Sequence, residues 1–333
     1  MIHHGHRCNA DSEESQTSQA AGSCCTHVQA RKIAAVIRVR NAAKELDRCL
    51  SALRRQVLPK GTELEMVVVD NDSTDDSGTV AQRHGAVVVP ISPAEFSWGR
   101  ALNRGIAQTR GAVVLLLSSD ATPADEYWVQ HMVEPFVEPD VAVVYGRQRP
   151  YPDAPVDERV RLERTFGAQA IALDKQQHAD NPSAKGMLAS NACAAVRRAV
   201  WQEHPYDEET SGGEEGPFTC QALKLGFRCL YQPSAQVYHS HRDGPWKLAC
   251  REWQILHKNV VYTGSRLKKR MLLRWWAGVV KRRLVNCIRV KAPWYYRMEG
   301  LVRLPIDVAA CVVVGSLLLR AKSRQKARQV FWR

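Results

Sequence analysis

From residue 33 to residue 120, apolar and polar residues alternate in segments of regular length. Ile33 to Val39 is an apolar run, and Glu65 to Asp70 is another. Between them, Ala43 to Val57 is amphipathic, with leucine recurring at helical spacing from Leu46 to Leu53. An apolar run, an amphipathic stretch and a second apolar run predict a β-α-β unit.

The same alternation continues beyond this unit. A polar helix is expected from Asp75 to His84 and a strand from Ala86 to Ile91; a second helix follows from Gly99 to Thr109 and a strand from Ala112 to Leu117. Strands that alternate with helices predict an α/β fold with a doubly wound, mostly parallel sheet. Ligands of such sheets bind beyond the carboxyl ends of the strands, where the polar residues of this chain gather.

After Asp120 the pattern is weaker. A helix is expected from Asp125 to Phe136 and a strand from Val141 to Tyr145, followed by a Pro- and Asp-rich loop from Pro150 to Asp157. The remaining elements expected are Ala189–Val196, a helix at Pro217–Leu225, a strand at Arg228–Tyr231, and Val237–His241. We predict a disordered leader at residues 1–30, one α/β domain at 31–241 and a basic helical tail at 242–333.

Charge is distributed unevenly along the chain. The net charge of +13 divides into +18 for residues 242–333, from 22 basic and 4 acidic residues, and −5 for residues 1–241. This division excludes a nucleic-acid groove in the main domain and predicts amphipathic helices on an anionic membrane surface. The alternative is that these helices pack on the domain or on a partner. The most apolar run, Val308 to Leu319, is short of the roughly twenty residues that a membrane span needs.

The leader and the cysteines indicate the compartment. Residues 1–30 lack the apolar stretch of a secretory signal, and none of the ten cysteines stands in a C-x-x-C spacing. We therefore expect reduced thiols and a cytoplasmic protein, attached peripherally to the inner face of the plasma membrane.

The most informative local segment is Val67 to Asp75, in which a buried strand ends in Asp-Asn-Asp-Ser-Thr-Asp. Such acceptors can bind a base and a ribose, although an Asx turn followed by a helix cap would use the same residues. Together with Ile37 to Asn41, this segment resembles the opening of the family-2 glycosyltransferases. The variant Arg38-Val39-Arg40 before Asn41 is typical of members that resemble bacterial rhamnosyltransferases.

Further motifs extend the resemblance over roughly two-thirds of the chain. They are Phe96–Asn103, Leu117–Pro123, Val144–Pro150, Ser190–Ala192 with Arg197–Trp201, Gly213–Glu215, Gly226–Phe227 and Val237–His241. The resemblance implies a GT-A fold and inverting transfer of a sugar from a nucleotide-diphosphate donor to a hydroxyl of a glycan or lipid-linked acceptor. Rhamnose from a thymidine diphosphate donor is the sugar that it suggests.

A metal-diphosphate site is expected at Asp120. The leaving diphosphate develops negative charge that a divalent cation neutralises, and oxygen ligands suit Mg²⁺ or Mn²⁺. The family more often has Asp-x-Asp where this chain has Ser118-Ser119-Asp120, and a turn cap before Pro123 is the alternative role for Asp120. His239 and His241 would face one side of an extended segment, and the resemblance implies that one of them completes the metal site.

The catalytic base that the resemblance implies is Glu215, with Glu214 beside it. The family has Glu-Asp here, and eleven residues back from Gly226 places Glu215 on the Asp. Inverting transfer needs such a carboxylate to take the proton of the acceptor hydroxyl. Acidic residues at a helix start also occur for electrostatic reasons alone.

The donor-binding residues that we predict lie at strand ends and on one helix. They are Arg38, Arg40, Asn41, Asp70, Asn71, Asp72, Arg100, Asn103 and Ser119. A nucleotidyltransferase of related fold is an alternative, but it would need a Gly-rich loop after the first strand, where this chain has Arg38 to Ala43. A non-catalytic sugar-nucleotide or membrane-binding protein with a degenerate site is the other.

Overall fold

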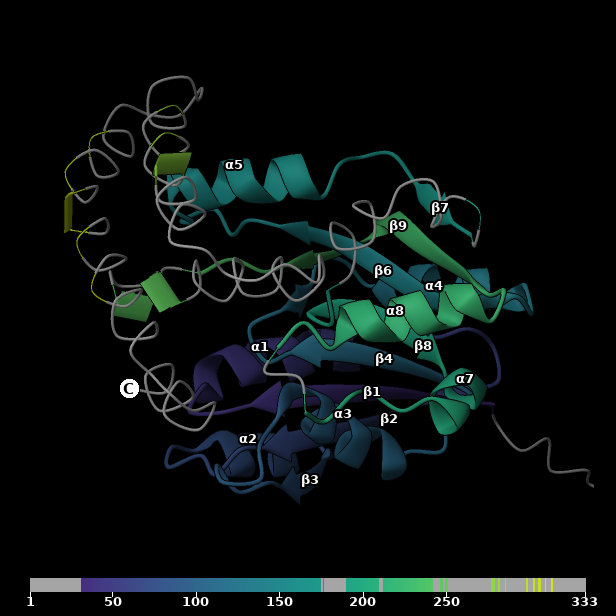
Figure 1. Cartoon of the computed structure of the whole chain (residues 1–333). Helices are drawn as coiled ribbons and strands as arrows, with labels where there is room; N and C mark the ends of the chain where they lie inside the picture. The colour runs from purple at the N-terminus through teal and green to yellow at the C-terminus, as the bar shows by residue number, and fades with distance from the viewer. Residues whose placement is uncertain are drawn as a thin grey trace, which may run out of the picture. The chain divides into compact units, whose positions relative to one another are not determined.

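The structure is a computed structural model, and it describes residues 31–174, 176, 190–209, 212–241, 246, 247, 249, 250 and isolated positions between 277 and 313. One sheet organises these residues, with strand order β3-β2-β1-β4-β8-β6-β9-β5 and β7 paired to β9 (Figure 1). Its strands are β1 (Arg31–Val39), β2 (Thr62–Asp70), β3 (Val87–Pro90), β4 (Val113–Ser118), β5 (Thr122–Pro123), β6 (Val141–Arg149), β7 (Ile171–Leu173), β8 (Cys193–Arg197) and β9 (Arg228–Tyr238).

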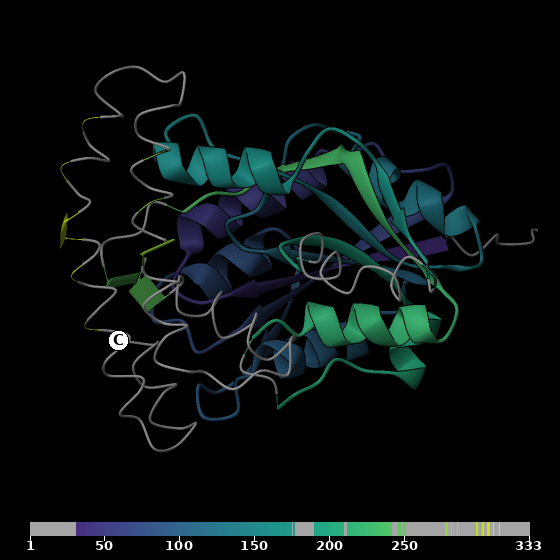
Figure 2. The ribbon, with the colours of Figure 1, turned by 45° about the horizontal axis from the view of Figure 1, so that its top comes forward.

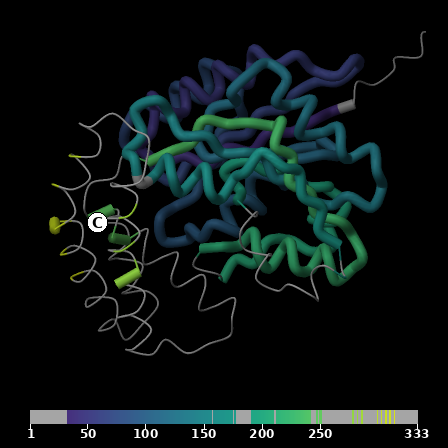
Figure 3. The backbone as a smooth tube through the Cα atoms, turned by 90° about the horizontal axis from the view of Figure 1, so that it is seen from above, coloured from purple at the N-terminus to yellow at the C-terminus, as the bar shows by residue number. Residues whose placement is uncertain are grey.

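Helices cover both faces of the sheet. They are α1 (Ala43–Arg54), α2 (Ser77–Arg83), α3 (Trp98–Ala107), α4 (Trp128–Val133), α5 (Val156–Thr165), α7 (Arg198–Glu203) and α8 (Glu215–Lys224), with a 3₁₀ turn, η1, at Glu134–Val137. Apolar residues of α3, α7 and α8 join one core cluster, and those of α1, α2 and α4 join the other. Figure 2 shows α8 as a layer beside the sheet, and Figure 3 places α8 and α1 on opposite sides of the strands.

The central strand β1 explains why its sequence reads as an unbroken apolar run. Ala34 and Val36 pack in the first core cluster, whereas Ala35 and Ile37 pack in the second. All four are fully buried. A parallel strand covered on both faces has no solvent side, so positions 33 to 37 are all apolar and the charged residues of β1 lie near its two ends.

The predicted α/β architecture is confirmed. β3, β2, β1 and β4 are paired in parallel, as the β-α alternation predicts. The second half of the sheet is mixed, because β8 runs antiparallel to both β4 and β6. Two further differences appear there. The segment expected at Arg228–Tyr231 and the first two residues of Val237–His241 belong to one strand, β9, and α5 begins inside the stretch expected to be a loop.

A bulge divides β9 into two parts. Gly146 of β6 pairs with Gln232, but the next residue of β6 pairs with Gln236, so β9 holds three extra residues at this point. Side chains alternate between faces along a strand, and an odd insertion reverses that alternation. Tyr231 accordingly packs in the first core cluster, while Val237, six residues later, packs in the second.

The leader at residues 1–30 and most of the predicted tail at 242–333 lie outside the described residues, so their boundaries stay predictions. Among the helical residues that the structure does describe, none belongs to a helix with the length and hydropathy of a membrane span. The five cysteines in the described part, Cys49, Cys193, Cys220, Cys229 and Cys250, are free thiols.

Gly146 tests the packing at the bulge. A Cβ at this position would overlap the Cys193 sulfur and lie 2.6 Å from the Ala235 carbonyl oxygen, and backbone atoms cannot move aside. We expect Gly146→Ala to lower the free energy of unfolding by about 1–3 kcal/mol in urea denaturation. Gly167→Ala is the matched control, because a Cβ there meets nothing within 4 Å. Equal midpoints for the two variants would contradict this packing.

Candidate active site

Three side chains from separate parts of the chain meet beyond the end of β4. Asp120 follows β4, and His239 and His241 follow β9. His239 Nε2 lies 3.5 Å from Asp120 Oδ1, and His241 Nδ1 lies 3.3 Å from Asp120 Oδ2. The ligand atoms of all three residues lie within 4.8 Å of one another. The carboxylate that stands alone in the sequence therefore has two imidazoles beside it.

Gln148 of β6 orients one of these imidazoles. Its Oε1 lies 2.7 Å from His239 Nδ1, and the backbone N–H of His239 donates to the Arg149 carbonyl. Because an amide oxygen only accepts, Nδ1 donates this hydrogen bond, and the ring turns Nε2 toward Asp120. Nε2 is thereby the His239 atom that would contact a cation held by the Asp120 carboxylate.

Asp120 is ionised in this setting. Burial alone would raise the pKa of its carboxyl group, but the charges and hydrogen bonds of His239 and His241 outweigh burial and hold the pKa well below its usual value. A metal ligand must be deprotonated, so this carboxylate is in the form that a cation requires.

The donor set fits a divalent cation. One carboxylate and two imidazoles can occupy one side of an ion and leave the other side for ligands such as phosphate oxygens. Imidazole nitrogen is a softer donor than oxygen, and Mg²⁺ is usually held by carboxylates, phosphates and water. The residues therefore favour Mn²⁺ over Mg²⁺.

Arg38 connects the site to the start of α8. Its Nη1 lies 3.0 Å from Glu214 Oε1, and the two side chains are only 9% and 4% exposed. Its guanidinium also lies 4.7 Å from the centre of the Trp98 ring. The Arg38 carbonyl accepts from the Ser119 backbone N–H, at 3.1 Å. One residue at the end of β1 thus contacts the neighbours of both Asp120 and Glu215.

The two predicted acidic residues have different surroundings. Glu214 precedes α8 and receives a second hydrogen bond, from Asn191 Nδ2 at 3.0 Å. Glu215 is the first residue of α8 and is 8% exposed, and its carbonyl accepts from Thr219 Oγ1. Gly212 and Gly213 precede this pair with φ values of 128° and 84°, a conformation that favours glycine.

A network of turns forms the sheet edge where a nucleotide is expected. Asn41 is left-handed, with φ 48°, and its Oδ1 accepts from the Thr74 N–H at 2.7 Å. The Asn41 N–H donates to Ser73 Oγ, and Asp70 Oδ1 accepts from both the N–H and the hydroxyl of Ser73. These bonds hold the ends of β1 and β2 together. The Asx turn proposed for this segment is present at its end, where Asp75 Oδ1 accepts from the Ser77 N–H.

The other predicted donor-site residues surround this edge. Arg40 and Asp72 are exposed, and Asp72 has φ 54°. Asn71 is only 2% exposed, and neither polar atom of its side chain has a hydrogen-bond partner among the described residues. A buried amide without partners is destabilising, so Asn71 is a group that a bound molecule could satisfy.

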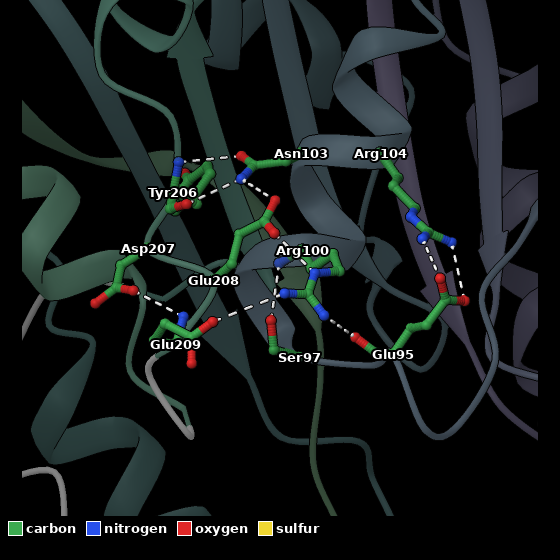
Figure 4. A network of polar contacts seen from close by, with 9 residues as sticks. All are labelled: Glu95, Ser97, Arg100, Asn103, Arg104, Tyr206, Asp207, Glu208 and Glu209. Atoms are coloured by element: carbon green, nitrogen blue, oxygen red, sulfur yellow. Dashed lines mark hydrogen bonds and ion pairs between the residues drawn. The ribbon is translucent and has the colours of Figure 1, made fainter.

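Arg100 and Asn103 of α3 contact the segment that leads toward α8, as Figure 4 shows. Arg100 Nε lies 2.7 Å from Glu208 Oε2, and Asn103 binds both Glu208 and the backbone of Tyr206. These contacts give both residues a role within the protein, and direct contact with a donor stays a prediction.

Several residues that contact the site are not among the site residues predicted from the sequence. Gln148, Asn191 and Tyr206 contact predicted residues, and Tyr151 donates its hydroxyl to Thr122 next to Asp120. Gln148 lies within a motif of the resemblance, but only the paired strands β6 and β9 bring it to His239. The other contacts likewise join segments far apart in the sequence.

Solved structures with the same fold define the class of protein. A mannosyltransferase from Pyrobaculum calidifontis, solved with GDP-Man and Mn²⁺, matches 90% of this chain and 84% of its own at a TM-score of 0.53 and 15% identity. Glucosyl-3-phosphoglycerate synthase from Mycobacterium tuberculosis, solved with Mg²⁺ and UDP, matches 72% of this chain and 81% of its own at 0.52 and 20%. The domain therefore has the GT-A fold of glycosyltransferases.

Sequence comparison identifies the family. Residues 34–204, half of the chain, match glycosyl transferase family 2, and the chain belongs to that family. The O-antigen chain rhamnosyltransferase WbaN of Salmonella anatum is 28% identical over 54% of this chain and 58% of its own length. RfbN of Salmonella typhimurium, with the same description, is 28% identical over 64% and 68%. The predicted resemblance to rhamnosyltransferase-like members is confirmed.

Arg38→Met tests the buried ion pair. The substitution removes the cation and leaves Glu214 buried, so we expect the free energy of unfolding to fall by about 3–5 kcal/mol in urea denaturation. Adding Glu214→Gln should recover part of this loss. Arg104→Met, which removes an exposed partner of Glu95, is the control and should change the midpoint little. If Arg38→Met and Arg104→Met lowered the urea midpoint equally, the ion pair between Arg38 and Glu214 would not stabilise the fold.

Proposed function

We propose that this protein is an inverting, metal-assisted glycosyltransferase that moves a sugar from a nucleotide-diphosphate donor to a hydroxyl of a glycan or lipid-linked acceptor. The observation that carries the proposal is the convergence of the Asp120–His239–His241 cluster and the start of α8 on Arg38. Membership of family 2 supports the reaction class.

We assign the base to Glu215 and a positioning role to Glu214. Glu214 is committed to Arg38 and Asn191, so its charge is already balanced inside the protein. The Glu215 carboxylate takes the proton of the acceptor hydroxyl as that oxygen bonds to the anomeric carbon. The bond from this carbon to the diphosphate oxygen breaks on the opposite face, and the nucleoside diphosphate leaves with the electron pair.

Asp120, His239 and His241 would hold a divalent cation, with Mn²⁺ preferred. When bound, the cation neutralises the charge that develops on the diphosphate. The turn of Asn41, Asp70 and Ser73 lies at the sheet edge where the nucleoside is expected, and the unsatisfied amide of Asn71 supports binding there.

The relatives support a donor sugar and a class of acceptor. The two Salmonella relatives are described as O-antigen chain rhamnosyltransferases, which supports rhamnose as the sugar and a cell-envelope polysaccharide intermediate as the acceptor. The charge of +18 on residues 242–333 supports peripheral attachment to the anionic inner face of the plasma membrane.

Asp120→Ala tests the metal site. We expect Mn²⁺ to raise the melting temperature in the presence of a nucleoside diphosphate, Mg²⁺ to do so less, and Asp120→Ala to abolish both effects. The reason is that the variant removes the only carboxylate of the cluster and leaves two imidazoles. Thermal-shift assays with and without each metal measure this. Metal enhancement that survives in the variant would place the cation elsewhere.

Glu215→Gln tests the base. The amide keeps the size of the side chain but cannot take a proton, so kcat should fall by about 10²- to 10⁴-fold while donor affinity is kept. Release of nucleoside diphosphate from a panel of nucleotide-sugars, with acceptor and Mn²⁺, measures the rate. If Glu214→Gln abolishes turnover and Glu215→Gln does not, Glu214 is the base. Donor binding by the unsubstituted protein without turnover of any donor would favour a non-catalytic binding protein.

A further inference from the structure

The side chain of Asn103 is fully occupied by hydrogen bonds within the protein. Its Oδ1 accepts from the Tyr206 backbone N–H at 3.0 Å and from Trp201 Nε1 at 2.9 Å. Its Nδ2 donates to the Tyr206 carbonyl at 2.9 Å and to Glu208 Oε1 at 3.1 Å. A side-chain amide has two lone pairs and two N–H groups, so these four bonds use its whole capacity. No group is left over for a donor molecule.

Tyr206, whose backbone N–H and carbonyl both bind Asn103, packs against α8. Its ring stacks on Phe218 of α8, with ring centres 4.5 Å apart, and it is 2% exposed. Its hydroxyl lies 3.3 Å from Asn191 Oδ1, and Asn191 Nδ2 lies 3.0 Å from Glu214 Oε1. Burial and the charges of Glu214 and Glu215 hold the pKa of the Tyr206 hydroxyl well above its usual value, so the group remains a donor.

A second set of contacts fixes the same segment to α3 (Figure 4). Arg100 Nε binds Glu208 Oε2 at 2.7 Å, and Ser97 caps the helix by accepting from the Arg100 N–H at 3.1 Å. A Cβ on Gly99 would overlap the Asp207 carbonyl oxygen. The absence of a side chain at Gly99 therefore lets α3 approach the backbone of residues 206–209 closely enough for these bonds.

From this geometry we infer that Asn103 is a positioning residue, which acts through Tyr206 and Asn191 to fix Glu214 and the first turn of α8, rather than a ligand of the donor. The effect expected on kcat rests on the proposed function. The positioning role replaces the donor contact predicted for Asn103. Its effect is to hold Glu215, the next residue, where the acceptor hydroxyl must meet it. A displacement of about 1 Å in such a group can cost roughly 10²-fold in rate.

The test is to remove the hydrogen bonds of Asn103 to Trp201, Tyr206 and Glu208 and to measure backbone exchange, donor affinity and turnover separately. Asn103→Ala should speed hydrogen–deuterium exchange in the peptide spanning residues 206–218. It should lower kcat by about tenfold or more and leave the dissociation constant of the nucleotide-sugar unchanged within about twofold. Arg104→Ala, the adjacent residue of α3, is the matched control. Its hydrogen bonds go to Glu95, and it acts on residues 206–209 through a charge interaction with Glu208 rather than a hydrogen bond, so all three values should change far less than in Asn103→Ala.

A second pair of variants guards against simple loss of folding. Asn103→Asp keeps the shape and the acceptor but places a carboxylate 3.1 Å from that of Glu208, so it should reproduce the loss of kcat. Adding Glu208→Gln restores a donor across this contact and should recover part of kcat. Weaker donor binding by Asn103→Ala, with unchanged exchange in residues 206–218, would overturn the inference in favour of a donor contact. The exchange measurement needs no activity, so failure of the proposed function would be recognised separately.

Discussion

The buried ion pair between Arg38 and Glu214 is the interaction on which the candidate site depends. Arg38 lies one residue before the end of the central strand β1, between Val69 of β2 and Ser118 of β4, and Glu214 precedes α8. A single charge in this place would be strongly destabilising, so each residue requires the other. The pair therefore fixes how α8 approaches the sheet, and the backbone of Arg38 fixes Ser119, next to Asp120, at the same time.

In the proposed reaction, this arrangement keeps the cation and the catalytic base apart. Two imidazoles and the Asp120 carboxylate would hold the cation. The two glutamates at the start of α8 would face the acceptor. Arg38 lies between them and balances one of the two glutamates. The proposal assigns the base to Glu215 because Glu214 already receives hydrogen bonds from Arg38 and Asn191 and because Glu215 stands where the family motif has its Asp.

The parts of the fold that local sequence determines could be predicted, and the parts that depend on distant contacts could not. β1 and β4 have apolar runs, and β2 has one in its second half, because both faces of the sheet are covered there. α1 shows a helical pattern because it packs one face on the sheet. The antiparallel β8 and the continuous β9 depend on pairing between segments far apart in the chain. At the site, Asp120 and the histidines could be named from their motifs. The full occupancy of Asn103 could not, because its partners follow it by about a hundred residues.

The bulge in β9 has a consequence for how relatives of this chain can differ in length. Three extra residues reverse the face of the strand to which each later side chain points. The bulge therefore decides the side to which His239 and His241 are directed. Gain or loss of one residue at positions 233–235 would turn both imidazoles to the opposite face of the strand, whereas a change of two would keep their direction. A relative that keeps both imidazoles beside the carboxylate is therefore expected to differ in length here by an even number of residues.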